Sequence, residues 1–292
     1  MNWIRIIIRI SLILILLCVS ASLISHQWST PEKNFEQTLK VITYNTQALC
    51  SGNRQQAKEM LSYINQQQAD VVCLQEVKVY KNSSLMSLAE LRSTMYQYPY
   101  TYYDFKRYNS KRQFGNVVFS KYPLINKHTV PYQSNNNISS CCDIVVNKDT
   151  IRLIVNHLES YKLIRKDLQF DTLSVDHIKN SSLNQKLKSA GELRHAQSKA
   201  VKKEIRQSPY PVVVVGDFNA IPLSYVYWKI KLGLRDCFLE GSWGQLGNTY
   251  KKGPLGIRID YILCSHKLIP IKCEVDRVTY SDHFPVCATI GW

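Results

Sequence analysis

Short apolar runs recur along the chain after residue 40, and most are bounded by turn-forming residues. Such runs, rich in Val and Ile, are typical of buried β-strands. Strands are predicted at residues 41–47, 70–77, 115–120, 124–130, 143–146, 151–157, 212–215, 258–264, 271–278 and 285–290. The aromatic-rich residues 96–108 are interpreted as core and sheet packing, with a stacking surface for bases as the alternative.

Two further segments carry apolar residues at helical spacing. Residues 53–68 show this spacing at Ala57, Met60, Leu61 and Ile64, and residues 187–207 repeat it. Both segments are predicted to be amphipathic helices. The many Lys and Arg residues between 160 and 207 are interpreted as a solvated helix face. A basic rim that guides a polyanionic substrate is the alternative.

Strands outnumber helices and often follow one another after a short turn, which predicts mixed or antiparallel sheets. Two such sheets leave two outer faces, which the two predicted helices can cover. We therefore expect an α/β protein, a four-layer α/β/β/α sandwich of two mixed sheets. Residues 39–292 form a single domain in this prediction, and the polar residues 29–38, with Pro31, form a linker before it.

The N-terminal residues 1–28 are a membrane anchor or a signal peptide in this prediction, because residues 4–24 are almost entirely apolar. A span of about 20 apolar residues can cross a bilayer as a transmembrane helix. Arg5 and Arg9 favour a cytoplasmic N-terminus, so we expect a single-pass membrane protein whose main domain is extracytoplasmic, either periplasmic or extracellular. A cleavable signal peptide is the alternative, since Val19-Ser20-Ala21 offers small residues for cleavage.

The formal net charge of +15 changes the expectation about partners. It predicts attraction to polyanions, which include nucleic acid, the headgroups of anionic phospholipids and phosphorylated small molecules. The charge alone does not choose among them, and a surplus that only serves solubility is the alternative. The sequence suggests no protein partner.

Cysteine spacing excludes one common type of site. The chain has nine cysteines but no Cys-x-x-Cys pair, so a structural zinc site is not expected. Cys273 and Cys287 lie on two strand-like runs joined by a turn and could form a disulfide in an exported domain.

Polar side chains stand at the ends of several predicted strands, where a rigid sheet edge can hold them. These residues are Asn45, Glu76, Asp217, Asn219, Asp282 and His283. Carboxylate and amide oxygens suit Mg²⁺ or Mn²⁺ better than zinc. Glu76 ends an apolar run, so its charge needs a cation or hydrogen bonds nearby. The pattern favours a metal-dependent hydrolase of phosphate esters.

In their order along the chain, these residues and their neighbours resemble the endonuclease/exonuclease/phosphatase superfamily, which has the DNase-I-like fold. The matching motifs are Tyr44-Asn45, Leu74-Gln-Glu76, Gly115-Asn116, Ser120-Lys-Tyr-Pro123, Asn156-His-Leu158, Gly216-Asp-Phe-Asn219, Arg258-Ile-Asp-Tyr-Ile262 and Ser281-Asp-His-Phe-Pro285. They span nearly the whole chain after the apolar N-terminal segment. The stretch Asn156-His-Leu-Glu-Ser160 is similar to that of membrane-anchored members of bacterial type.

The resemblance implies a role for each residue at the metal and the attacking water. Glu76, Asn45 and Asp282 would hold Mg²⁺ or Mn²⁺, although the amide of Asn45 could instead orient a carboxylate or the phosphate. Asp217 would position or deprotonate the attacking water. Asn219 would donate a hydrogen bond to the charge that grows on the phosphate oxygens.

The remaining roles concern the phosphate and the leaving group. His283 would contact the scissile phosphate while Asp260 holds its imidazole, which favours the charged imidazolium. His157 would protonate the leaving oxygen. Asn116 and Arg258, which belong to the matching motifs, would bind the substrate.

The resemblance determines the reaction class better than the substrate. We expect a phosphodiesterase that acts on nucleic acid or on a phospholipid headgroup. His157 stands where an abasic-site nuclease would carry Tyr, and this argues against a role in DNA repair. Two alternatives remain, namely a phosphomonoesterase of the same fold, as the inositol phosphatases are, and a catalytically inactive polyanion-binding module.

Overall fold

The structure, a computed structural model, describes residues 34–49, 53–81, 85–109, 112–134, 137–161, 182–242, 244–251 and 256–292. The predicted membrane segment and the first part of the predicted linker lie outside these ranges, and both remain predictions. Within the described ranges, no helix is both long and apolar enough to cross a membrane.

The first of two six-stranded sheets has the strand order β11-β12-β1-β2-β4-β3. Its strands are β1 (Thr38–Asn45), β2 (Val71–Tyr80), β3 (Tyr100–Asn109), β4 (Arg112–Ser120), β11 (Ile269–Val275) and β12 (Val286–Gly291). β1 pairs in parallel with β2 and antiparallel with β12. The sheet is therefore mixed. β1 and β12, the first and last strands of the described chain, lie side by side in its middle.

The second sheet has the order β5-β6-β7-β8-β10-β9. Its strands are β5 (Leu124–Thr129), β6 (Ser139–Val146), β7 (Asp149–His157), β8 (Val212–Asp217), β9 (Leu234–Asp236) and β10 (Asp260–Ser265). β7 and β8 are parallel, whereas β8 and β10 are antiparallel. This sheet is mixed as well.

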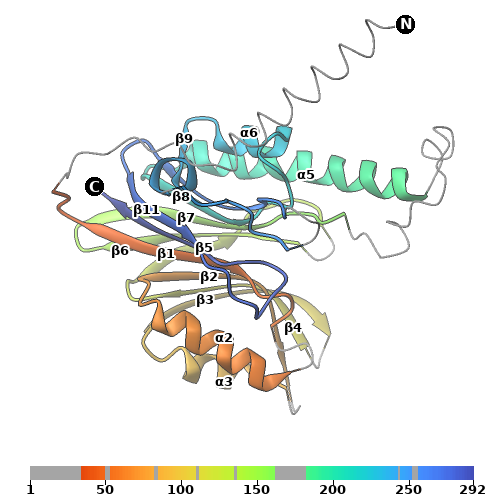
Figure 1. Cartoon of the computed structure of the whole chain (residues 1–292), viewed down its shortest axis with the longest axis horizontal. Helices are drawn as coiled ribbons and strands as arrows, with labels where there is room; N and C mark the ends of the chain where they lie inside the picture. Colours follow the sequence, from red (N-terminus) through yellow and green to blue (C-terminus); the bar gives the residue numbers. More distant parts are fainter. Residues whose placement is uncertain are drawn as a thin grey trace, which may run out of the picture.

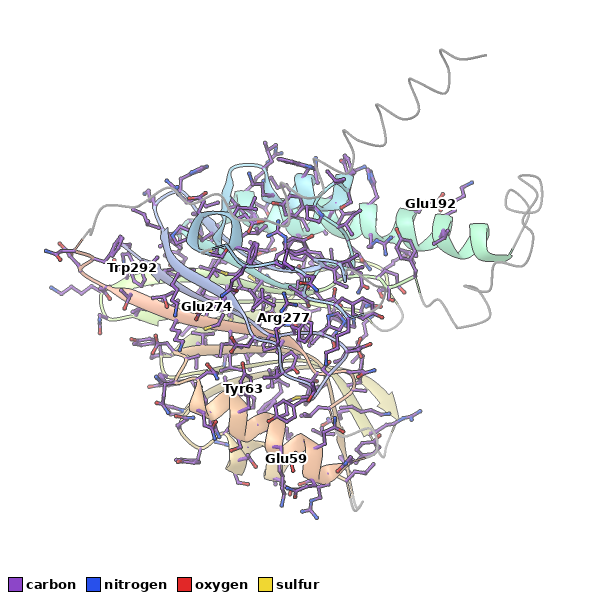
Figure 2. The ribbon with its side chains drawn as sticks, in the orientation of Figure 1. Glu59, Tyr63, Glu192, Glu274, Arg277 and Trp292 are labelled. Atoms are coloured by element: carbon purple, nitrogen blue, oxygen red, sulfur yellow. The ribbon has the colours of Figure 1, made fainter. Side chains whose placement is uncertain are left out.

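Helices cover the outer face of each sheet (Figure 1). α2 (Arg54–Gln66) and α3 (Leu88–Thr94) cover the first sheet, while α5 (Ser182–Gln207) and α6 (Tyr225–Lys231) cover the second. A short helix, α7 (Cys237–Gly241), follows β9. Tyr63 projects from α2, and its hydroxyl donates a hydrogen bond to Asp276, just after β11 (Figure 2). Two mixed sheets between helical layers confirm the predicted sandwich.

Three hydrophobic cores separate the four layers. Side chains alternate along a strand, so β1 sends Val41 into the core between the sheets and Ile42 into the core beneath α2. The third core lies between the second sheet and the helices α5 and α6, where Val214 packs with Val201 and Tyr227. Both sheets and their covering helices are complete within residues 34–292. We therefore expect residues 34–292 to fold without residues 1–33.

Several elements differ from the sequence prediction. Tyr100–Asn109 forms an edge strand, whose Tyr103 meets Phe119 edge-on with ring centroids 6.2 Å apart. Sheet packing is thus confirmed for Tyr103, whereas Tyr96 lies before the strand and is exposed. The short elements α3, α6, α7 and β9 were not predicted. Each spans seven residues or fewer, too short for a periodic pattern to stand out.

Cys273 and Cys287, which could have formed a disulfide, do not form one. Although β11 and β12 are neighbours, Cys273 lies opposite Ala288 and Cys287 lies opposite Glu274. This offset of one residue places the two side chains on opposite faces of the sheet, and both thiols are free.

Candidate active site

Three polar side chains lie in register on neighbouring strands of the second sheet. His157, at the end of β7, is opposite Asp217, the last residue of β8. Asp260, the first residue of β10, is opposite Asp217 on its other side. β8 runs parallel to β7 and antiparallel to β10, so two strand ends and one strand beginning meet at the same edge. This register brings together residues that the sequence keeps far apart.

The first sheet adds two more residues, Asn45 at the end of β1 and Glu76 from within β2. Asn45 is the last residue of β1, and its side-chain amide donates hydrogen bonds to Oε1 of Glu76 at 3.3 Å and to Oδ2 of Asp217 at 3.0 Å. Asn45 therefore links the polar residues of the two sheets. Its Oδ1 accepts a hydrogen bond from the backbone of Gln47 at 3.0 Å.

A bulge in β2 aims Glu76 into the site. The pairing of β2 with β4 shifts register between Leu74 and Val77, and Glu76 has a left-handed φ of 55°. A β-bulge of this kind commonly turns a side chain away from the regular alternation beside a functional site. The apolar run before Glu76 is thus a regular buried strand, whereas the carboxylate lies at an irregularity.

Gly216 allows β8 to approach β7 immediately before Asp217. Its φ is 115°, and a Cβ added there would lie 2.0 Å from the carbonyl oxygen of Asn156. No other residue type fits this backbone without displacing it. The conformation thus places Asp217 at the edge where the site forms.

Asp217 is buried and accepts several hydrogen bonds. The backbone amide of Asn219 donates to Oδ1 at 2.8 Å, and its side-chain amide donates to Oδ2 at 3.1 Å. Burial and the charge of Asp260 raise the pKa of Asp217 to about 6, against the lowering effect of His283 and His157. A carboxylate with a pKa near neutrality suits a general base.

His283 lies between two carboxylates. Its Nδ1 donates to Oδ2 of Asp260 at 2.9 Å, and its Nε2 lies 3.8 Å from Oδ2 of Asp217. Burial alone would lower the pKa of His283, but the two carboxylates raise it to about 10. The imidazole is therefore protonated at neutral pH.

His157 contacts Glu76 and does not itself line the pocket described below. Its Nε2 lies 3.3 Å from Oε1 of Glu76, and its side chain is almost fully buried. Burial would lower the pKa of His157, yet the hydrogen bond and charge of Glu76 raise it. Burial likewise opposes ionisation of Glu76, but the bond from His157 and the amide of Asn45 lower the pKa of Glu76 to about 2. Glu76 is consequently ionised at any ordinary pH.

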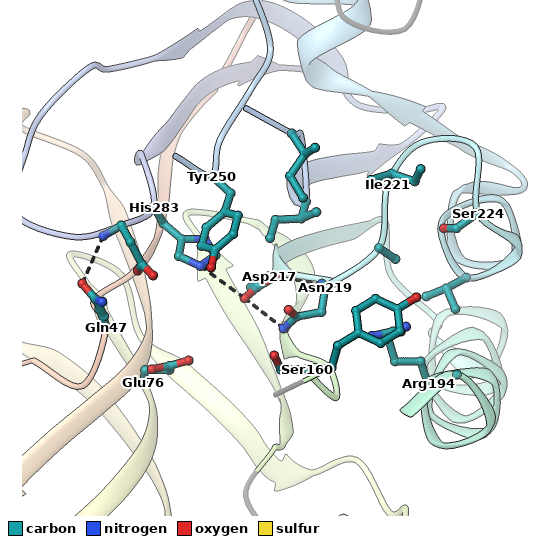
Figure 3. A pocket seen from close by; sticks show the side chains of 17 residues that line it. Gln47, Glu76, Ser160, Arg194, Asp217, Asn219, Ile221, Ser224, Tyr250 and His283 are labelled. Atoms are coloured by element: carbon teal, nitrogen blue, oxygen red, sulfur yellow. Dashed lines mark hydrogen bonds and ion pairs between the residues drawn. The ribbon is translucent and has the colours of Figure 1, made fainter. Parts of the chain in front are cut away.

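A pocket of about 750 Å³ opens over these residues (Figure 3). Glu76, Asp217, Asn219, Asp282 and His283 line its polar side. The opposite side is mostly apolar, and Arg194 is its charged residue. It is formed by Tyr161, Arg194, Ala220, Ile221, Val226, Ile257 and Ile259. The pocket therefore offers a polar reaction site beside room for an organic group.

The polar side of the pocket fits a hard divalent cation. Glu76 and Asp282 are carboxylates that line the same pocket, and oxygen ligands of this kind suit Mg²⁺ or Mn²⁺. The amide nitrogen of Asn45, not its oxygen, faces Glu76, so orienting that carboxylate fits Asn45 better than ligation. Ligand atoms of Asp217, Asp260 and His283 also lie within 4.8 Å of one another, but His283 occupies the space between the carboxylates as their proton donor.

Two predicted substrate-binding residues lie elsewhere. Arg258 is 1% exposed, and its guanidinium pairs with Asp236 at 2.9 Å, against the aromatic rings of Phe238 and Tyr261. Asn116 is also buried, and its side-chain amide donates to Ser140 Oγ and to the carbonyl oxygens of Ile138 and Val155. Neither side chain lines the pocket, and both make their polar contacts in the protein interior.

Sequence reasoning also missed residues that line the pocket, above all Arg194 and Tyr161. The Arg and Lys residues of α5 were interpreted as a solvated face, yet Arg194 is 3% exposed and stacks on the Tyr161 ring at 3.8 Å. Its Nη1 donates to the carbonyl oxygen of Glu159 at 2.8 Å. Helical periodicity could have placed Arg194 on the inner face, but its basic neighbours concealed that signal.

Comparison with known proteins agrees with this geometry. The family described as Endonuclease/Exonuclease/phosphatase matches residues 42–283. The sequence matches none of the curated proteins with which it was compared. Among solved structures, an endonuclease/exonuclease/phosphatase from Beutenbergia cavernae DSM 12333 is similar, with a TM-score of 0.67 and 18% identity over 88% of this chain and 72% of that chain.

Two further structures show the same fold. Sphingomyelinase C from Streptomyces griseocarneus aligns with a TM-score of 0.63 and 18% identity, over 87% of this chain and 99% of that one. A mannosyl-6-phosphatase from Bacteroides thetaiotaomicron VPI-5482 aligns with a TM-score of 0.60 and 15% identity, over 87% of this chain and 100% of that one. With the family match over most of its length, the chain belongs to the endonuclease/exonuclease/phosphatase family.

Proposed function

We propose that this protein is a Mg²⁺-dependent phosphodiesterase that acts outside the cytoplasm. The observation that carries the proposal is the arrangement of Asp217 between a protonated His283 and the amide of Asn45, in a pocket that Glu76 also lines. Members of this family hydrolyse phosphoesters, and two proteins of the same fold are named for a sphingomyelinase and a sugar phosphatase activity.

Asp217 is assigned the role of general base. Its pKa of about 6 leaves it ionised at neutral pH and able to accept a proton from a water that attacks phosphorus. Asn219 donates to Asp217, and its amide also donates to the carbonyl oxygen of Leu158 at 3.0 Å. We therefore assign Asn219 to orienting Asp217, in place of the predicted bond to the phosphate.

The phosphate is assigned to His283, whose imidazolium Asp260 holds in place. A cation beside the phosphate stabilises the negative charge of the transition state. Glu76 and Asp282 would hold Mg²⁺, which when bound neutralises phosphate oxygens. His157, whose pKa Glu76 raises, is assigned to give its proton to the leaving oxygen.

The location outside the cytoplasm rests on residues 4–24, whose apolar run follows Arg5 and contains Arg9. Retention of this segment would make the protein a single-pass membrane protein with its catalytic domain extracytoplasmic. Fractionation of cells that express the full chain tests this location. Protease added outside spheroplasts should digest the domain, and full protection would contradict the assignment.

Hydrolysis of two chromogenic esters tests the activity. A protein comprising residues 34–292 should hydrolyse bis(p-nitrophenyl) phosphate, a diester, faster than p-nitrophenyl phosphate, a monoester. Mg²⁺ should be required, EDTA should abolish the reaction, and Asp217→Ala should remove it. Asp70→Ala, which changes a carboxylate paired with Lys121 far along the first sheet, is the matched control and should keep full activity.

The outcomes separate the possible activities. A preference for the monoester would assign the site to a phosphomonoesterase instead. If folded protein hydrolyses neither ester but still binds polyanions, the protein is a binding module and the proposal is wrong. Nicking of supercoiled plasmid in the same buffers then shows whether nucleic acid is a substrate.

A further inference from the structure

A group of exposed apolar side chains lies next to the pocket, and the proposed reaction does not account for it. Residues 221–232, which we call the α6 surface, comprise α6, the loop before it and the residue after it. Within this stretch, the large apolar side chains Ile221, Leu223, Tyr225, Trp228 and Leu232 are all exposed to solvent. A soluble domain rarely concentrates exposed apolar side chains in one short stretch without a partner.

α6 is apolar on two opposite faces. Val226, Tyr227 and Ile230 point inward and belong to the core beneath the helix. Tyr225, Trp228 and Leu232 follow one another at intervals of three and four residues, so they share the other face. Their side chains are 51%, 54% and 63% exposed. Packing onto the sheet accounts for the first face only.

The α6 surface is continuous with the pocket. Ile221 and Ser224 line the pocket as well as belonging to this surface (Figure 3). Ile257 lines the pocket from another segment and is also exposed. A partner that covers the α6 surface would therefore lie at the pocket mouth, beside the residues assigned to hydrolysis.

The charge of this stretch has one sign. Lys229 and Lys231 flank the exposed face, and no Asp or Glu occurs between Asp217 and Asp236. The ammonium of Lys231 lies over the ring of Trp228, 5.2 Å from its centroid. The surface thus combines aromatic and aliphatic side chains with cations.

We propose that the α6 surface docks onto an anionic phospholipid membrane and presents the pocket to the phosphodiester of a lipid headgroup. Trp and Tyr prefer the boundary between water and lipid, where their apolar rings and polar atoms are both accommodated. Leu and Ile side chains gain free energy when they leave water, and adjacent Lys residues pair with anionic headgroups. The choice of substrate rests on the proposed function, whereas the docking does not.

Two other partners fit these residues less well. Nucleic acid binding relies on cations along the phosphate backbone, and exposed Leu223 and Leu232 contribute nothing to it. A second copy of this chain would have to cover Lys229 and Lys231 with the same stretch of the other copy, since a two-fold interface is self-complementary, and this stretch contains no Asp or Glu to pair with them. A membrane surface accommodates both the apolar and the cationic side chains.

Vesicle binding tests the docking. Residues 34–292 contain the complete fold, so this part should bind sedimenting vesicles of phosphatidylglycerol without the N-terminal segment. The double variant Trp228→Ser, Leu232→Ser should bind about tenfold more weakly or worse. Lys229→Gln with Lys231→Gln should reduce binding to phosphatidylglycerol but not to phosphatidylcholine. Tyr96→Ser is the matched control, because Tyr96 is 82% exposed beyond α3, over the other sheet, and its loss should change nothing.

Hydrolysis separates the docking from the proposed function. The Trp228→Ser, Leu232→Ser variant should lose about tenfold in rate on phospholipid in vesicles and retain its rate on bis(p-nitrophenyl) phosphate. If the wild-type protein hydrolyses neither substrate, the proposed function is refuted. The docking would still be supported if the variant binds vesicles more weakly than the wild type. Equal vesicle binding by wild type and variant would overturn the docking. The docking would also be overturned if sedimentation velocity showed a dimer of the wild-type protein and a monomer of this variant alone, because the surface would then be a dimer interface.

Discussion

Nδ1 of His283 lies 2.9 Å from Oδ2 of Asp260, although 23 residues separate them in the chain. Asp260 begins β10, whereas His283 lies in the loop before β12, in the other sheet. The pair therefore joins the two sheets at the edge where Asp217 ends β8. Ser281 supports this loop, since its hydroxyl donates to the carbonyl oxygen of Asn45 at 2.8 Å. The His283 imidazole is positioned by contacts that exist only once both sheets have packed.

This pairing predicts a pH-dependent contribution of His283 to stability. The pKa of His283 is about 10 in the folded protein and 6.5 ordinarily, so its charged form stabilises the fold fully below pH 6.5. That contribution should decline between pH 6.5 and about 10, as the folded protein loses the proton. Denaturant unfolding of the metal-free protein in EDTA should show the gap between wild type and His283→Gln narrowing over this range. The control is His266→Gln, at an exposed turn.

Substitution of His157 should affect esters according to their leaving group. We expect His157→Gln to slow hydrolysis by roughly 10²-fold when the leaving group is a poorly acidic alcohol, because a general acid is lost. The loss should be much smaller for p-nitrophenolate, which leaves without a proton. Steady-state rates on the two kinds of diester provide the comparison. An equal loss on both, or a loss under about tenfold on the alcohol ester, would leave His157 a structural role.

Replacement of Gly216 should disturb both stability and the position of Asp217. A Cβ would lie 2.0 Å from the carbonyl oxygen of Asn156, so Gly216→Ala should cost at least about 2 kcal/mol of unfolding free energy. Activity should fall as well. Gly191→Ala on α5 is the control, because nothing lies within 4 Å of its added Cβ. That change should stabilise the protein, by up to about 1 kcal/mol.

The assignment of Arg258 to the interior predicts a change in stability without a change in chemistry. Asp236→Ala leaves the buried guanidinium of Arg258 without its carboxylate and should cost about 3–5 kcal/mol. The rate per folded molecule and the KM should stay at the wild-type values. Thermal unfolding and kinetics below the transition measure the two effects separately. A raised KM in this variant would indicate that Arg258 takes part in substrate binding.

Mg²⁺ binding should depend on Glu76. Calorimetry of wild-type protein should detect binding of Mg²⁺, and Glu76→Gln should weaken it by about tenfold or more, because a charged oxygen ligand is lost. Glu90→Gln on α3 is a suitable control, since Glu90 pairs with Arg54 on the surface. Unchanged affinity in Glu76→Gln would remove Glu76 from the metal site.

Strands and helices with strong patterns could be predicted because those patterns are local. Val212–Asp217 is an apolar strand that ends in an acid, and apolar side chains recur every three or four positions in residues 53–68. The expected β8 and α2 were therefore found. α6 could not be found in this way. Its two faces are both apolar, and a helix with a single apolar stripe is what periodicity detects.

The sequence by itself determined the fold class, the family motifs and the polar residues at the strand ends. Strand alternation and the identity of a side chain are properties of a few neighbouring residues. Only the tertiary structure decided which of these residues meet. Strand register places His157 and Asp260 on either side of Asp217, a bulge aims Glu76, and packing turns Arg258 inward and Arg194 toward the pocket. Each of these depends on contacts between residues far apart in the chain, whose geometry no local pattern contains.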